Sequence, residues 1–262
     1  MGAPAMIRAA AALLLVAATP AIAQDGPRFC PNRPSVGTST CITDPGRVLV
    51  EASGVDWQRD GDATSILVGD LLLRTGIDDR TEAQVGWTPL SHLVSRENGL
   101  RTVATGTGDV RLGIRRNLRH PDGEGLSIAI EGFATLPTAT DGLGRGDWSA
   151  GLVVPVSWEM GKWSLALTGE VDAETNASRT GRHPAGALTL GLGRDLADTV
   201  TAVVEVSGRR DDDPARAQTQ VLTAASIAWE VRPRMQLDLL VAAGLDAQAP
   251  SLRIVLGGAV LF

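Results

Sequence analysis

The end of the chain constrains its fold more than any other feature. Counting back from the terminal Phe262, residues alternate between two faces: Leu252, Ile254, Leu256, Gly258 and Val260 on one, and Arg253, Val255, Gly257, Ala259 and Leu261 on the other. An alternating segment of about ten residues that stops on an aromatic residue is typical of the last strand of a bacterial outer-membrane β-barrel. Edge strands of soluble sheets alternate in the same way, so the rest of the chain must decide.

The beginning of the chain has the pattern of a secretory signal peptide over residues 1–23. One basic residue, Arg8, precedes the apolar run AAAALLLVAAT, and the small residues around Ala23 predict cleavage before Gln24. The run is too short to anchor the protein in a membrane, which needs about 20 apolar residues. Losing Arg8 changes the formal charge from −6 to −7 (−6 − 1), and such acidity argues against nucleic-acid binding.

Alternation recurs along the rest of the chain. No run of about 18 apolar residues follows the signal, so no transmembrane helix is expected. We predict an all-β fold: a transmembrane up-and-down antiparallel β-barrel over residues 47–262, with a bulge where the phase changes near Gly54. About 12 strands are expected, at residues 48–59, 65–77, 81–89, 108–119, 126–136, 148–159, 162–174, 186–194, 200–209, 221–232, 235–246 and the C-terminal segment.

The connections between these segments predict the orientation. Alternate links are short, such as EMGK and VRPR, whereas most of the others are longer and polar, such as SHLVSRENGLRTVATGT. Short periplasmic turns and long extracellular loops are the pattern of outer-membrane barrels, so both ends should lie in the periplasm. A soluble sandwich or closed barrel would instead turn its apolar face inward.

The two cysteines, Cys30 and Cys41, lie in a Pro-rich segment at residues 24–46, which we predict to be a periplasmic N-terminal segment. In an oxidising compartment a structural disulfide is expected, with two free thiols as the alternative.

The inward face of the predicted strands carries charges of both signs. These charges either pair to stiffen the wall or line a constriction that selects solutes. Arg111 and Arg115 share one face of one strand and are the best candidates for a constriction. The predicted lumen residues are Asp70, Arg74, Glu82, Asp109, Arg111, Arg115, Glu131, Glu170, Asp172, Glu205, Glu230, Asp238 and Arg253.

Evidence for catalysis is weak. A Ser–His–acid arrangement would have to use His92 with Ser91 or Ser95, and a solvated histidine beside unrelated serines is the better explanation of these residues. The acidic run at residues 211–213 is a solvated charge run or a cation site. We expect no catalytic residue, no metal and no cofactor.

The stretches TGTGDVRLGIRRNL and EGFATLPTATDGLGRGDWSAGLVVPVSWEMGKWSLAL resemble outer-membrane transporter proteins grouped as the "putative MetA-pathway of phenol degradation" family. The resemblance covers roughly residues 45–262. It implies a barrel channel that passes small solutes, aromatic or hydrophobic compounds included.

The sequence therefore predicts an outer-membrane channel for passive or facilitated diffusion of small solutes. A non-conducting structural or adhesive barrel, plugged by its charges or its N-terminal segment, is the alternative, followed by a lipid-modifying enzyme. Expected partners are outer-membrane lipids and the barrel-assembly machinery, which would recognise the C-terminal strand ending at Phe262.

Overall fold

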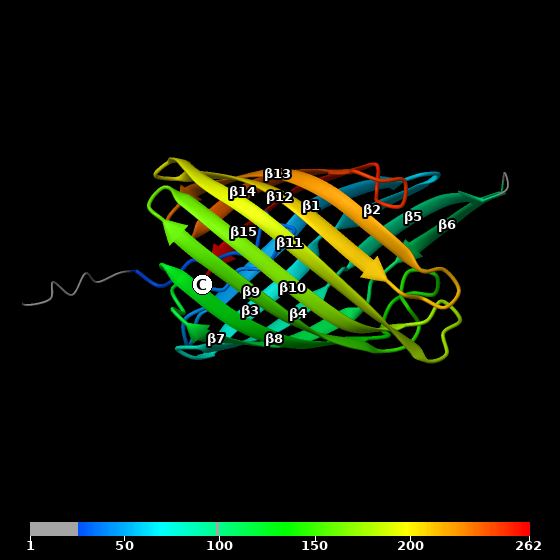
Figure 1. The fold of residues 1–262 in the computed structure, drawn as a ribbon, viewed down its shortest axis with the longest axis horizontal. Coiled ribbons are helices and arrows are strands. Elements are labelled where there is room, and N and C mark those ends of the chain that lie inside the picture. Colours follow the sequence, from blue (N-terminus) through cyan, green and yellow to red (C-terminus); the bar gives the residue numbers. More distant parts are fainter. Residues whose placement is uncertain (1–25, 98–99) are drawn as a thin grey trace, which may run out of the picture.

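The computed structural model describes residues 26–97 and 100–262, which form a closed antiparallel β-barrel (Figure 1). The predicted signal peptide and its cleavage site lie outside the described residues. No helix in the described part of the chain is long and apolar enough to span a membrane. The strands are β1 (Val48–Asp60), β2 (Ala63–Val68), β3 (Asp70–Asp78), β4 (Thr81–Trp87), β5 (Leu90–Glu97), β6 (Leu100–Gly106), β7 (Val110–Arg119), β8 (Leu126–Leu136), β9 (Ser149–Met160), β10 (Trp163–Thr175), β11 (Arg182–Ala197), β12 (Val200–Asp211), β13 (Gln218–Arg232), β14 (Met235–Gly244) and β15 (Leu252–Leu261).

The barrel closes between its first and last strands, because β1 pairs along its length with β15. The wall consists of β1, β3, β4 and the nine strands from β7 to β15, which makes the 12 strands that the sequence predicted. The register of β1 against β15 shifts between Ser53 and Val55, so the bulge predicted near Gly54 is confirmed.

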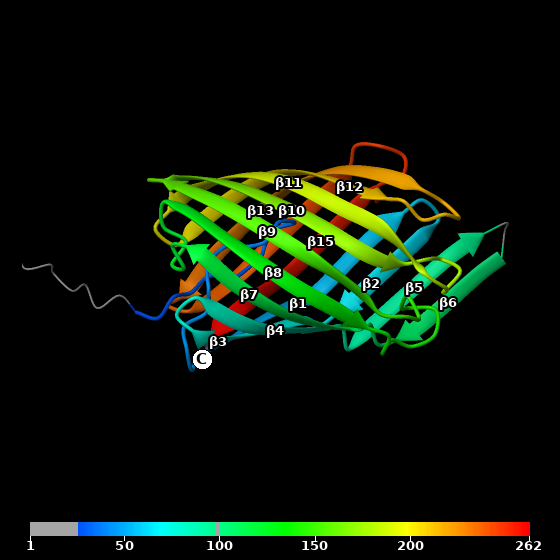
Figure 2. The same ribbon diagram turned by 60° about the horizontal axis from the view of Figure 1, so that its bottom comes forward.

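Three short strands extend the wall beyond the barrel at one end. Gly69 separates β2 from β3, and Thr88 and Pro89 separate β4 from β5. β2 pairs with β5 and β5 with β6, so a hairpin projects from the barrel (Figure 2). The segment SHLVSRENGLRTVATGT, which we expected as a loop, is thus mostly this hairpin. Pro89 and Gly108 are residue types found at loop boundaries, so the alternating pattern of the segment between them was not recognised as strands.

The two faces of the wall differ as predicted. On β14, Leu237 and Val241 are exposed on the outside, whereas Gln236 and Asp238 are buried on the inside. Side chains alternate across a strand, so each strand presents an apolar face to the exterior and a mostly polar face to the lumen. This arrangement is that of a membrane barrel, and it is opposite to that of a soluble barrel.

The two ends of the barrel also differ. Both described ends of the chain and the short links, such as Gly161 between β9 and β10, lie at one end, called here the turn end (Figure 1). The long connections and the projecting hairpin lie at the other, the loop end. Phe262 follows β15 at the turn end, where its amide donates to the carbonyl of Val48 at 2.9 Å.

Candidate functional site

A network of buried charges fills one side of the lumen. Arg74 of β3 is 0 % exposed; its Nε lies 2.9 Å from Glu82 Oε1 and its Nη1 3.1 Å from Glu51 Oε1. Arg115 of β7 is equally enclosed and lies 2.8 Å from Glu131 Oε2 and 3.4 Å from Glu82 Oε1. Because these residues occupy inward positions on neighbouring strands, opposite charges meet at hydrogen-bond distance, which is the condition for burying them.

The N-terminal segment, residues 26–46, binds to this network from inside the barrel. Arg74 donates from Nη1 to the carbonyl oxygen of Cys30 at 2.6 Å and from Nη2 to that of Cys41 at 2.8 Å. The amide of Thr43 donates to Glu82 Oε2 at 2.8 Å. We predicted a periplasmic segment here, and plugging of the lumen by it belonged to our alternative. Its described part lies in the lumen, because its backbone satisfies hydrogen-bonding groups of the buried charges.

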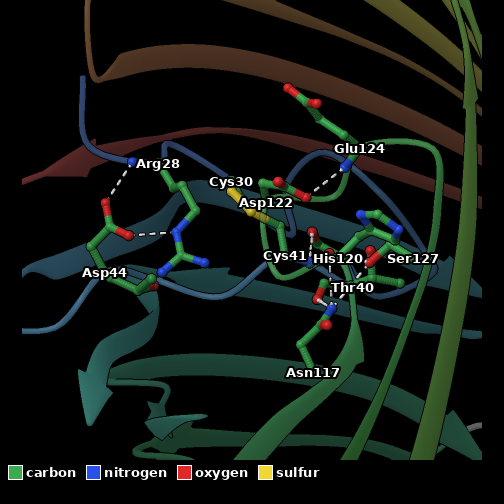
Figure 3. The surroundings of a disulfide bond; sticks show 12 residues. Arg28, Cys30, Thr40, Cys41, Asp44, Asn117, His120, Asp122, Glu124 and Ser127 are labelled. Atoms are coloured by element: carbon green, nitrogen blue, oxygen red, sulfur yellow. Dashed lines mark hydrogen bonds and ion pairs between the residues drawn. A yellow bond between two sulfur atoms is a disulfide. The ribbon is translucent and has the colours of Figure 1, made fainter. Parts of the chain in front are cut away.

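Cys30 and Cys41 form the predicted disulfide bond, with their Cα atoms 5.8 Å apart. The bond closes a loop over residues 31–40, which we call the plug loop (Figure 3). Arg28 and Asp44 form an ion pair just outside the base of this loop. Asn117 of β7 donates to a carbonyl oxygen of the loop at 2.8 Å. The base of the plug loop is therefore held closed by the disulfide bond and is bound to the wall by Asn117.

The tip of the plug loop contacts β12 and β10. Glu205 of β12 accepts three hydrogen bonds from it: Ser35 Oγ at 2.6 Å, the amide of Val36 at 2.9 Å and the amide of Gly37 at 3.0 Å. A Cβ atom at Gly37 would lie 3.0 Å from Thr168 Oγ1 of β10, so the backbone approaches the wall closely. The plug loop thus spans the lumen from β3 to β12.

Arg33 holds the side of the plug loop against the seam of the barrel. Its Nη2 lies 2.7 Å from Asp238 Oδ1 of β14, and its Nη1 donates to Ser53 Oγ of β1 at 2.8 Å. The amide of Arg33 donates to Glu51 Oε2 at 3.0 Å. Gly257 of β15 leaves room for this guanidinium, since a Cβ atom there would collide with it.

A cavity of about 460 Å³ remains between the plug loop and strands β9–β13. Hydroxyl groups and glycines dominate its wall, and carboxylates lie toward the turn end. Phe29 is the only aromatic residue among the described residues that line it. Wall residues include Ser157, Glu159, Ser164, Thr168, Thr189, Gly191, Gly193, Asp195 and Thr201.

Toward the loop end, a second group of charges lies on the inward faces of β10 and β12. Arg209 lies 3.2 Å from Glu170, 3.0 Å from Asp172 and 3.0 Å from Glu174. The plug loop therefore lies between two charged sections of the lumen, the Arg209 group on one side and the cavity carboxylates on the other.

A carboxylate also organises the long connections. Asp213 accepts hydrogen bonds from the amides of Ala177 at 2.6 Å and Ala215 at 2.7 Å, and these bonds hold the pKa of Asp213 below its usual value. Nearby, His183 Nε2 of β11 lies 2.8 Å from Asp211 Oδ1. The acidic run that we considered as a cation site therefore joins two loops. In the described residues no group of three or more His, Cys, Asp or Glu side chains could hold a metal ion.

The structure places most of the predicted lumen residues on the inward face of the wall. Asp109 is an exception, because it lies in the link between β6 and β7 and accepts from the amides of Ala139 and Arg145. Glu230 faces inward opposite Gln236, at the turn end, and accepts from the amide of Arg234. A pore-lining role for the predicted residues stays a prediction. The others on the inward face are Asp70, Arg74, Glu82, Arg111, Arg115, Glu131, Glu170, Asp172, Glu205, Asp238 and Arg253.

Arg111 and Arg115, our candidates for a constriction, are both paired. They bind the same carboxylate, since Arg111 Nη2 lies 2.7 Å from Glu131 Oε1, and Arg111 also stacks 3.7 Å from the ring centre of Phe133. Arg115 is fully buried among its partners, whereas the Arg111 side chain is 40 % exposed. A constriction at these residues stays a prediction.

Sequence reasoning missed Glu51 and Arg33. Glu51 occupies an inward position on β1, which the alternation could have revealed. Arg33 lies outside any strand, and its contact with Asp238 joins residues 205 positions apart, so no local pattern signals it.

His92 does not assemble a catalytic triad with its neighbouring serines. Its Nδ1 lies 2.7 Å from Thr105 Oγ1, across the hairpin. Ser91 and Ser95 are on the opposite face of β5, because residues one and three positions away point to the other side of a strand. Ser95 binds Thr102 Oγ1 at 2.6 Å instead.

Comparison with solved structures supports the fold. An outer membrane channel from Pseudomonas putida F1 superposes with a TM-score of 0.63 and 16 % identity, covering 82 % of this chain and 94 % of that one. The KdgM porin, in complex with disordered oligogalacturonate, gives a TM-score of 0.55 and 8 % identity, covering 82 % and 99 %. The translocator domain of the autotransporter NalP from Neisseria meningitidis gives 0.50 and 12 %, covering 82 % and 88 %.

No curated protein matches this chain significantly. The family model described as "Putative MetA-pathway of phenol degradation" matches residues 31–259, which include the plug loop as well as the barrel. The resemblance noted in the sequence is therefore confirmed, and the chain belongs to this family.

Proposed function

We propose that the protein is an outer-membrane channel for passive or facilitated diffusion of small solutes. The observation that supports this proposal most strongly is the cavity of about 460 Å³ inside a closed barrel with an apolar exterior. A barrel that served only as a scaffold could fill its lumen with side chains, as small barrels do. Here the residues of β10 and β11 that line the cavity are small, so the lumen is not filled.

The lining of the cavity combines hydrogen-bonding groups with apolar surface. Ser164 and Thr168 offer hydroxyl groups, and Glu159 offers a carboxylate. The family resemblance implies aromatic or hydrophobic compounds, and Phe29 and Val203 offer apolar contacts in the same cavity. A small solute with both apolar surface and hydrogen-bonding groups fits this wall.

A non-conducting, plugged barrel is the second candidate. The three hydrogen bonds between Glu205 and the plug loop favour it, because they hold the loop across the lumen. Passage of a solute requires either the space beside the loop or release of its tip from Glu205.

Single-channel recording in planar bilayers tests both candidates. We expect a small conductance for the wild type and a larger one for Glu205→Ala, which frees the tip of the plug loop. Glu230→Ala is the matched control, because this carboxylate lies at the turn end and binds only a backbone amide of the adjacent turn among the described residues. If neither the wild type nor Glu205→Ala conducts, the channel proposal fails and the plugged barrel is favoured.

A further inference from the structure

The extension formed by β1, β2, β5 and β6 continues the lipid-facing exterior of the barrel. Directly opposed residues of antiparallel strands share a face. The register aligns Trp57 of β1 with Ile66 of β2, and Ile66 with His92 of β5. On the other side, Trp57 faces Ile254, an outward residue of β15. One surface therefore runs from the barrel exterior onto the outer face of the hairpin.

This outer face is mostly apolar near the barrel, where it also carries His92 and Thr105, and basic at its tip. Val94 and Val103 form an opposed pair on it, and Arg96 and Arg101 form the next opposed pair, two residues farther out. Arg59 of β1 lies on the same face, in the row of Val94. We call Arg59, Arg96 and Arg101 the arginine cluster; all three side chains are exposed.

The arginine cluster lacks ion-pair partners among the described side chains. Two other exposed arginines have such partners: Arg116 pairs with Asp78, and Arg210 with Asp212. Like charges placed directly opposite each other destabilise a strand pair, and Arg96 and Arg101 are placed in this way. An anion shared by the two guanidinium groups would remove that repulsion.

We propose that the arginine cluster binds the phosphate groups of a phosphorylated glycolipid in the outer leaflet, with its acyl chains against the apolar face below. Guanidinium groups bind phosphate through paired hydrogen bonds. Exposed Leu90 and Val103 and half-buried Val94 lie between the barrel and the cluster, over about 20 Å of strand between Leu90 and Arg96. The apolar surface thus ends where the charges begin, as it would at the level of lipid headgroups. The proposal rests on the outer-membrane location proposed above.

Native mass spectrometry of the detergent-solubilised full chain tests this inference. The probes are hexa-acyl lipid A with two phosphates and the same lipid after removal of both phosphates. We expect the wild type to prefer the phosphorylated form, and Arg96→Gln/Arg101→Gln to bind it about 30-fold more weakly, because each arginine adds to the attraction of an anionic headgroup. Binding of the dephosphorylated lipid should change little.

The matched control is Arg194→Gln/Arg232→Gln, which removes two exposed arginines at the turn end and should leave lipid A binding intact. The inference is overturned if the wild type does not distinguish the two lipids, if the control loses as much binding, or if excess inorganic phosphate displaces the lipid. Conductance is measured on the same variants. Selective lipid binding by a barrel that does not conduct would refute the channel proposal alone.

Discussion

Replacing Arg74 should destabilise the barrel strongly. The side chain is 0 % exposed and donates to Glu51, Glu82 and the carbonyl oxygens of Cys30 and Cys41. Arg74→Met keeps most of the volume but leaves two carboxylates buried with fewer partners. Removing one partner of a buried ion pair costs about 3 to 5 kcal/mol. We expect the lower end, about 3 kcal/mol, because a second guanidinium still lies 3.4 Å from Glu82.

Urea unfolding of the protein in lipid vesicles, followed by the fluorescence of its six tryptophans, measures this free energy. Arg116→Met is the control: Arg116 lies 3.7 Å from Asp78, and both side chains are 56 % exposed, so its loss should cost about 0 to 1 kcal/mol. The rate at which dithiothreitol reduces the disulfide gives a second readout, and it should rise in Arg74→Met because the base of the plug loop is loosened. Equal effects of the two substitutions on the free energy of unfolding would refute the role assigned to Arg74.

Three further predictions follow from the wall, the plug loop and the long connections. Leu239→Arg should lower the free energy of unfolding by about 2 to 4 kcal/mol near the membrane midplane and reduce the folded yield, whereas Leu239→Ala should have a far smaller effect. Similar yields of the two variants would contradict the outward position of Leu239. Cys30→Ser/Cys41→Ser should lower the free energy of unfolding by about 2 to 3 kcal/mol for a loop of this size, and an unchanged urea midpoint would show that wall contacts alone order the loop. The pKa of Asp213 is lowered in the folded state, so this carboxylate stabilises the two loops fully above the ordinary carboxyl pKa of about 4. The stabilisation is lost as pH falls through the lower folded pKa. Hydrogen exchange at residues 175–182 should therefore accelerate at acid pH, and in Asp213→Asn already at pH 7.

Alternation in the sequence was enough to predict the wall. On β14 it assigned Asp238 to the lumen and Leu239 to the exterior, and a one-residue error would have exchanged every side chain between the two faces. The bulge near Gly54 was predictable for the same reason, because a bulge reverses the phase of the pattern.

The content of the lumen could not be predicted in this way. Residues 26–46 contain no strand-length alternation, and their positions depend on contacts such as that between Arg33 and Asp238, which no local pattern encodes. The pairing of Arg111 and Arg115 with one carboxylate could not be predicted for a related reason. Alternation shows that a charge points inward, but it does not show that a carboxylate such as Glu131 lies opposite.

The position of the plug loop imposes an order on the assembly of the protein. Cys41 is 4 % exposed, and the loop that it closes is enclosed by a wall whose seam is the contact between β1 and β15. Large oxidising enzymes cannot enter a closed barrel, and Arg33 contacts the seam strand β1 and the strand β14 next to the seam. We therefore expect enzymatic oxidation of Cys30 and Cys41 to precede closure of the seam. A chain whose seam closed first would keep its thiols out of reach of such an enzyme.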